Sequence, residues 1–218
     1  NSLLLQPQVV DNLFSHRSRE NCIANLNKLR IPKYGKLPTA AVLVPLCVIN
    51  GTVSLLYTLR SSQLRKHSGQ ISFPGGKCDE GESSVDTAVR ETYEEIGISK
   101  DQITVWGSGP AVPGRDFSIL ITPVVSNVDI KVENLKLNTD EVEKVFTAPL
   151  SALCDSKNHF HTEFKNGIVL PVFIFEEYKI WGITAYITHT FLSSLLPREV
   201  YENKIGTKTK ISINKGDI

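Results

Sequence analysis

The pattern of apolar and polar residues along the chain predicts a mixture of strands and helices. Residues 40–49 form a strongly apolar run that predicts a buried strand. The dipeptide Asn50-Gly51 is typical of a tight turn, so residues 53–59 are expected to pair with that strand as a hairpin. Shorter apolar runs predict further strands at residues 71–73, 103–106, 118–125, 145–150, 160–164 and 168–175.

Helical spacing of apolar residues appears at residues 9–30, 83–96 and 184–195, with a further short helix near 151–154. Because hairpins alternate with helices, we expect an α/β fold of the α+β type, with a mixed sheet sandwiched between helices. A doubly wound parallel sheet is disfavoured.

Breaks in the pattern divide the chain into three parts. Pro32, Gly35 and Pro38 end the first helical pattern, and residues 198–218 are polar with few large apolar side chains. We therefore predict an N-terminal helical extension over residues 1–36 and a central domain over residues 37–182. Residues 183–218 are expected to form a helix packed on that domain, followed by a mobile tail.

Composition narrows the function classes. The chain has 218 residues, of which 41% are hydrophobic and 22% charged, with a formal net charge of +1. Lysine and arginine are spread along the chain, so no basic tract indicates nucleic-acid binding. No apolar run approaches the roughly 20 residues that a membrane-spanning helix requires.

The cysteines and the missing methionine bear on location. The four cysteines form no Cys-X-X-Cys pair and no secretory signal is visible, which predicts reduced thiols in an intracellular protein. The sequence begins at Asn1 and contains no methionine, so we expect the natural first residue, and any targeting peptide attached to it, to be absent. The last residues do not match the Ser-Lys-Leu peroxisomal signal.

The helix at residues 83–96 carries the strongest chemical signal. Ser83 or Ser84 can cap its start and Gly97 can end it. One stripe of the helix is expected to pack on the sheet through Val85, Val89, Thr92 and Ile96.

Three carboxylates, Glu91, Glu94 and Glu95, are related by steps of three and four residues and are expected on a face roughly opposite the stripe. They repel each other unless a cation binds, and hard oxygen ligands suit Mg²⁺ or Mn²⁺. Arg90 can pair with one carboxylate and fix its orientation. A solvated acidic face is the alternative, but Pro74-Gly75-Gly76 precedes the helix and lets the backbone approach a ligand closely.

The spacing of these residues resembles the Nudix box, GX5EX7REUXEEXGU, in which U is a bulky apolar residue. The matching positions are Gly76, Glu82, Arg90, Glu91, Glu94, Glu95, Gly97 and Ile98. Thr92 departs from the pattern, because it stands where an apolar residue is usual. Thr92 lies on the packing stripe, so the departure does not put catalysis in doubt.

The resemblance implies the Nudix fold and metal-assisted hydrolysis of a nucleoside diphosphate linked to another moiety. It implies that Glu91, Glu94 and Glu95 hold Mg²⁺ or Mn²⁺, with the Gly76 carbonyl as a further ligand. The identity of the general base varies in this family, and both Glu91 and Glu141 remain open. For Glu141 the alternative is an exposed loop acid.

The segment before the box indicates the substrate. Arg60 and Arg65 lie in a polar stretch that leads into the glycine turn, and guanidinium groups suit phosphate oxygens. Without context these would be surface arginines. The segment resembles the signature LLTXRSX3RX3GX3FPGG of coenzyme A diphosphatases, with Tyr57 inserted after the leucine pair. The resemblance implies substrate contacts from Arg60, Ser61, Arg65, Gly69 and Gly75.

The wider match, over residues 40–182, is most similar to the mitochondrial coenzyme A diphosphatases of vertebrates. It implies cleavage of coenzyme A to 3′,5′-ADP and 4′-phosphopantetheine, with acyl-CoA thioesters as further substrates. Three alternatives stay open: another Nudix substrate such as NADH, ADP-ribose or a nucleotide sugar; an inactive module that only binds a ligand; and a peroxisomal or cytosolic location. A homodimer is also left open.

Overall fold

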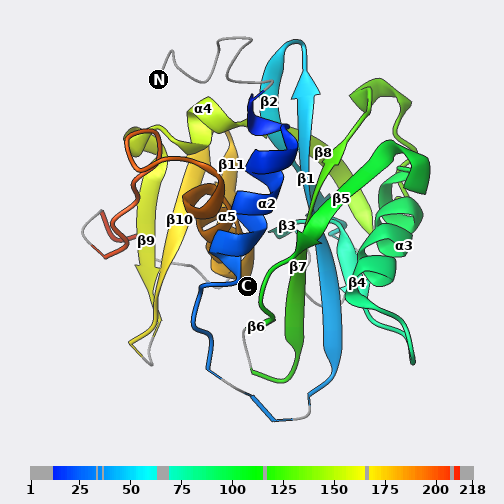
Figure 1. The fold of residues 1–218 in the computed structure, drawn as a ribbon, viewed down its shortest axis with the longest axis horizontal. Coiled ribbons are helices and arrows are strands. Elements are labelled where there is room, and N and C mark those ends of the chain that lie inside the picture. The colour runs from blue at the N-terminus through cyan, green and yellow to red at the C-terminus, as the bar shows by residue number, and fades with distance from the viewer. Residues whose placement is uncertain are drawn as a thin grey trace.

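The computed structural model describes residues 12–32, 34–35, 37–62, 69–114, 117–164, 167–206 and 209–211. Its main element is an eight-stranded mixed sheet with the strand order β3-β2-β1-β7-β5 (Figure 1). Strand β4 pairs with β1, β6 pairs with β7 and β8 pairs with β2. The predicted mixed sheet is therefore confirmed.

The centre of this sheet is the predicted hairpin. Strands β1 (Thr39–Ile49) and β2 (Thr52–Arg60) run antiparallel. Asn50 and Gly51 connect them with φ values of 49° and 75°, which explains why this dipeptide suits the turn. Strand β7 (Leu120–Val128) runs parallel to β1 on its other side.

The remaining strands of the main sheet are short or peripheral. They are β3 (Ile71–Ser72), β4 (Gly75–Lys77), β5 (Ile103–Ser108), β6 (Val112–Pro113) and β8 (Val142–Pro149). The segment around Gly75 and Gly76 was expected to be a loop, and that expectation is wrong. It pairs with β1 as strand β4, because residues without Cβ atoms can lie close against the neighbouring backbone.

A second, antiparallel sheet consists of β9 (His159–Glu163), β10 (Val169–Phe175) and β11 (Tyr178–Ile180). The predicted hairpin of residues 160–164 and 168–175 is confirmed by the pairing of β9 with β10. Strand β11 was not predicted.

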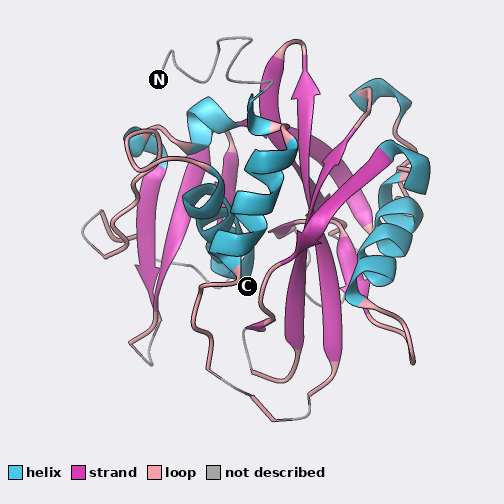
Figure 2. Ribbon diagram, viewed as in Figure 1, coloured by secondary structure: helices cyan, strands magenta, loops and turns pink. Residues whose placement is uncertain are grey.

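Helices cover both faces of the main sheet (Figures 1 and 2). Helix α3 (Ser84–Ile96) packs on one face, over a core cluster that includes Ala41 and Leu43 of β1. Helices α2 (His16–Leu26) and α5 (Gly182–Leu195) pack together on the other face. That second core cluster includes Val44 and Leu46 of β1 and also covers the second sheet.

Short helices complete the fold. They are α4 (Leu150–Leu153) and the 3₁₀ turns η2 (Lys100–Gln102), η3 (Val132–Asn134) and η4 (Ser156–Asn158). None of the helices in the described part combines the length and hydrophobicity that a bilayer-spanning segment requires.

The two ends were expected to carry an extension and a mobile tail. The extension contributes α2, whereas residues 9–11 of its predicted helical pattern lie outside the described residues. In the C-terminal segment, Tyr201 is buried and its hydroxyl lies 2.9 Å from Nδ1 of His189. Thr209 and Ile211 hydrogen-bond to His161 of β9. The mobility predicted for residues 207–208 and 212–218 concerns residues outside the described part.

Candidate active site

Helix α3 begins and ends at the residues that the sequence predicts. The Ser83 hydroxyl accepts a hydrogen bond from the backbone N–H of Asp86 at 3.1 Å, which satisfies one of the free donors at the helix start. Gly97 ends the helix in the left-handed region, with φ of 74°. Thr92 is buried on the packing side and its hydroxyl donates to the Ala88 carbonyl, so the departure from the box pattern is accommodated.

The three carboxylates of the helix differ in burial. The Glu95 side chain is 2% exposed, Glu91 is 16% exposed and Glu94 is 51% exposed. The expectation that all three lie opposite the packing stripe is therefore wrong for Glu95. Glu95 follows the buried Ala88 by seven residues, which is almost two full turns, so both lie on nearly the same side of the helix.

Glu95 joins the box helix to the segment that precedes it. Its Oε2 accepts the backbone N–H of Gly75 at 3.3 Å, and its Oε1 lies 3.6 Å from Nη1 of Arg60. Burial raises the pKa of Glu95 to about 8, and the Arg60 charge and the Gly75 hydrogen bond oppose this rise. Two predicted substrate residues, Arg60 and Gly75, thus contact one predicted metal ligand.

Glu91 lies directly against Gly76. A Cβ atom on Gly76 would overlap the Glu91 carboxyl group, so only glycine leaves room for the observed position of that acid. Burial raises the pKa of Glu91; the negative charges of Glu94 and Glu141 add to the rise, whereas Arg90 opposes it. The structure therefore brings together Gly76 and Glu91, as the resemblance implies.

Arg90 connects the acidic residues. Its Nε and Nη2 donate to the two carboxylate oxygens of Glu82, each at 2.9 Å. Its Nη1 donates to Glu91 and to Glu94, each at 3.0 Å. The hydrogen bonds from Arg90 are the first cause of a Glu82 pKa of about 2. The predicted pairing of Arg90 with a carboxylate is present, and Glu82 is a partner that sequence reasoning did not identify.

Glu141 reaches the same place from a distant loop. The Asn138 backbone N–H donates to the Glu95 carbonyl at 2.9 Å, which holds this loop against the end of α3. The Glu141 carbonyl accepts the Ser61 backbone N–H at 2.8 Å. The Glu141 charge raises the pKa of both Glu91 and Glu95, which places its carboxylate within electrostatic range of the helix.

The other predicted substrate residues differ in what the structure shows. Gly69 donates its N–H to the Arg60 carbonyl at 3.0 Å, and Ser61 is buried. Arg65 lies outside the described residues.

The donor chemistry of the site fits a divalent cation. Repulsion couples Glu91 to Glu94 and Glu141, and Glu95 to Glu141 and Glu91, and together with burial it raises the pKa values of Glu91 and Glu95. A cation would relieve this excess of negative charge. In the described part of the chain, no three His, Cys, Asp or Glu side chains are already grouped to hold a metal ion. Glu91 and Glu94 instead share the Arg90 guanidinium.

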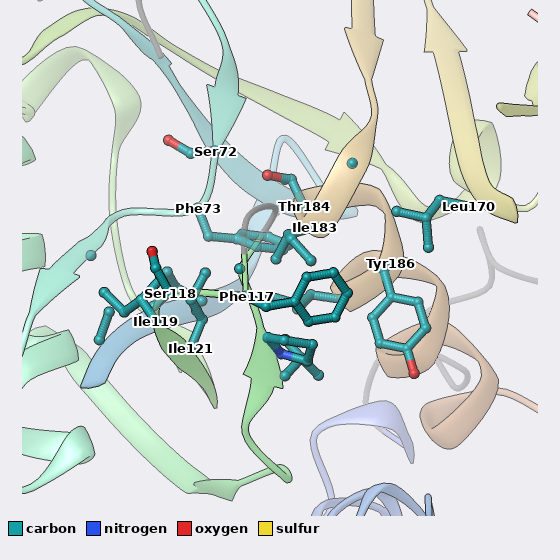
Figure 3. Close-up of a pocket in the computed structure, with 18 of the residues that line it drawn as sticks. Ser72, Phe73, Phe117, Ser118, Ile119, Ile121, Leu170, Ile183, Thr184 and Tyr186 are labelled. Carbon is teal, nitrogen blue, oxygen red and sulfur yellow. The ribbon is translucent and has the colours of Figure 1, made fainter. Parts of the chain in front are cut away.

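A cavity of about 940 Å³ opens beside these residues (Figure 3). Arg60, Gly75 and Gly76 line it, whereas no described residue of helix α3 does. Much of the remaining wall is apolar. In Figure 3 Phe117 lies near Ile183 and Tyr186 of α5, and Ile119 and Ile121 lie on the opposite side of Phe117. Sequence reasoning did not identify this wall, because its residues come from segments far apart in the chain.

Comparisons with known proteins identify the family to which the chain is related. Residues 37–167 match the family described as "NUDIX domain". The "Mitochondrial coenzyme A diphosphatase NUDT8" of Mus musculus is 43% identical over 165 residues, which cover 72% of this chain and 78% of the relative. "Nudix hydrolase 3" of Caenorhabditis elegans is 32% identical and covers 89% of this chain and 91% of its own.

A third relative is also named as a coenzyme A diphosphatase, but its name gives a peroxisomal location. "Peroxisomal coenzyme A diphosphatase ndx-8" of Caenorhabditis elegans is 34% identical over 72% of this chain and 68% of the relative. The matched domain holds both the box helix and the glycine strand, and the chain belongs to the Nudix hydrolase family.

Proposed function

We propose that the protein hydrolyses the diphosphate bond of coenzyme A, releasing 3′,5′-ADP and 4′-phosphopantetheine. The observation that carries this proposal is the contact of Glu95 with both Arg60 and Gly75. It joins the segment that resembles the coenzyme A diphosphatase signature to the helix that resembles the Nudix box. Acyl-CoA thioesters are included, because the acyl group is remote from the diphosphate.

The names of two relatives support the same substrate. One relative is named as mitochondrial and the other as peroxisomal, and we propose a mitochondrial location because the mitochondrial relative is more similar.

Nudix hydrolases generally use a divalent cation such as Mg²⁺ or Mn²⁺. Here Glu91, Glu94, Glu95 and the Gly76 carbonyl would hold it. When bound, the cation would polarise the phosphoryl oxygens and lower the pKa of the attacking water.

The side chains around this position have separate tasks in the proposal. Arg90 is a positioning residue that holds Glu82, Glu91 and Glu94 in one arrangement. Glu91 or Glu141 accepts the proton of the attacking water, and both acids lie close enough to affect the site electrostatically. Arg60 pairs with a substrate phosphate oxygen as well as with Glu95.

The substrate is tested by comparing coenzyme A, NADH and ADP-ribose as substrates with Mg²⁺ or Mn²⁺. We expect the highest kcat/KM for coenzyme A, and mass spectrometry of products formed in ¹⁸O-water would identify the phosphorus attacked. Cleavage of coenzyme A no faster than the others would reject the proposed substrate and favour another Nudix activity.

Catalytic competence is tested with Glu95→Gln, which keeps the size of the side chain and removes its charge. We expect a loss of roughly 100-fold or more in kcat, because a ligand of the activating cation is lost. Glu143→Gln, at an exposed position on β8, is the matched control and should retain full activity. Unchanged turnover in Glu95→Gln would show that the catalytic assignment is wrong.

A further inference from the structure

Among the described residues, the charged side chains that line the cavity are all of one sign. Among the described residues its wall includes three cations, Arg30, Arg60 and Lys77, and no carboxylate. Arg60 is engaged by Glu95, whereas the ion pairs formed within the described part include neither Arg30 nor Lys77. The described part of the wall therefore has positive charge available for a second anionic group, in addition to a phosphate bound near Arg60 at strand β4.

Two aromatic rings also line this cavity. Tyr34 and Phe117 pack against each other with ring centroids 6.2 Å apart and an interplanar angle of 39°. Phe117 is 42% exposed. Its backbone φ of 57° is in the left-handed region, where a bulky residue is strained. The fold thus holds an open aromatic face at the cavity at some cost in backbone energy.

The position of these residues in the chain separates them from the hydrolytic machinery. Arg30 and Tyr34 precede the segment that matches the family domain, which begins at residue 37. Phe117 lies between β6 and β7, away from the box helix. Arg30 and Tyr34 therefore lie outside the matched domain, and none of the three residues belongs to the box helix.

We propose that Arg30, Tyr34 and Phe117 bind the 3′-phosphoadenosine half of coenzyme A. The Arg30 guanidinium pairs with the 3′-phosphate, and the Tyr34 and Phe117 rings provide a surface on which the adenine base stacks. This inference rests on the proposed function, since coenzyme A carries a third phosphate that is separate from its diphosphate. A second cationic position, distinct from Arg60, matches that arrangement of charges.

Dephospho-coenzyme A, which lacks only the 3′-phosphate, tests the role of Arg30. We expect the unaltered protein to prefer coenzyme A in kcat/KM by about tenfold, the ratio that corresponds to one charge-assisted contact. Arg30→Ala should reduce the ratio to near one, mainly through the KM for coenzyme A. Arg30→Lys should retain part of the preference. Arg198→Ala removes an exposed arginine outside the cavity and should leave the ratio unchanged.

Phe117→Ala should produce a different pattern. The adenine base is common to both substrates, so the KM for each should rise by about tenfold while their ratio stays the same. Because Phe117 is exposed, the variant should fold normally, which thermal unfolding can verify. Val48→Ala, which shortens a residue of equal exposure on β1, is the control.

Binding without turnover separates this inference from the proposed function. In EDTA, calorimetric titration should show that 3′,5′-ADP binds about tenfold more tightly than 5′-AMP, and that Arg30→Ala removes the difference. If neither coenzyme is cleaved but this binding difference is found, the proposed function fails and the inference stands. If coenzyme A is cleaved while Arg30→Ala keeps the original preference for it, the inference is overturned.

Discussion

Gly76→Ala is the sharpest test of how strand β4 sets the position of the Glu91 side chain on helix α3. A Cβ at this position would lie 2.5 Å from Oε2 of Glu91, and ordinary contact begins at 3.4 Å. The carboxylate would have to retreat by at least the difference, 0.9 Å, because its Cδ and Oε1 atoms would lie closer still. Misplacing a reacting group by about 1 Å costs roughly 100-fold in rate, so we expect kcat to fall by about that factor.

The backbone at Gly76 does not require glycine, because its φ is outside the left-handed region. The effect should therefore appear in activity and not in folding. Steady-state kinetics with coenzyme A and Mg²⁺ would measure it, alongside thermal unfolding. Gly35→Ala is the matched control, since a Cβ there meets nothing within 4 Å. A Gly76→Ala protein with kcat within threefold of the unaltered protein would refute the steric reasoning.

Three further predictions concern the charges of the fold. The Arg90 guanidinium contacts three carboxylates, and Arg90→Lys puts a single ammonium group in its place. We expect kcat to fall roughly 100-fold, and unchanged kinetics would contradict a positioning role. In EDTA at pH 9, Glu95→Gln should melt at a higher temperature than the unaltered protein, and the difference should vanish near pH 5. The folded-state pKa of Glu95, about 8, lies above the ordinary value of 4.5, so its contribution to stability is complete below 4.5 and is lost as the pH rises through 8. Burial lowers the pKa of His189 from 6.5 to about 4, so its stabilising contribution is complete above 6.5 and is lost as the pH falls through 4. Between pH 7 and 4, chemical unfolding should show that the free energy of unfolding falls by on the order of 3 kcal/mol more in the unaltered protein than in His189→Gln. Equal falls in the two proteins would refute this prediction.

Features determined by neighbours in sequence were predictable. The limits of α3 follow from a serine cap and a left-handed glycine, and the hairpin of β1 and β2 follows from Asn50-Gly51. The pairing of Arg90 with Glu94 also follows from the four-residue spacing of a helix.

Features determined by tertiary packing were not predictable in the same way. Helical spacing places Glu95 near Ala88, but only the packing of α3 against β1 and β4 shows that this side is buried. The Glu82 partner of Arg90 comes from the loop before the helix, where no periodic rule applies. Arg30 and Phe117 line the same cavity although they are far apart in the sequence.

The burial of Glu95 links stability to the proposed chemistry. A buried carboxylate with one guanidinium at 3.6 Å and one backbone donor is incompletely compensated, which is why its pKa rises. Replacing it with a neutral residue should stabilise the metal-free fold at alkaline pH, so the ionised acid is costly there. The same uncompensated charge favours binding of a divalent cation, because the cation supplies what Arg60 does not. At pH 9, Mg²⁺ should therefore raise the melting temperature of the unaltered protein by more than it raises the melting temperature of Glu95→Gln.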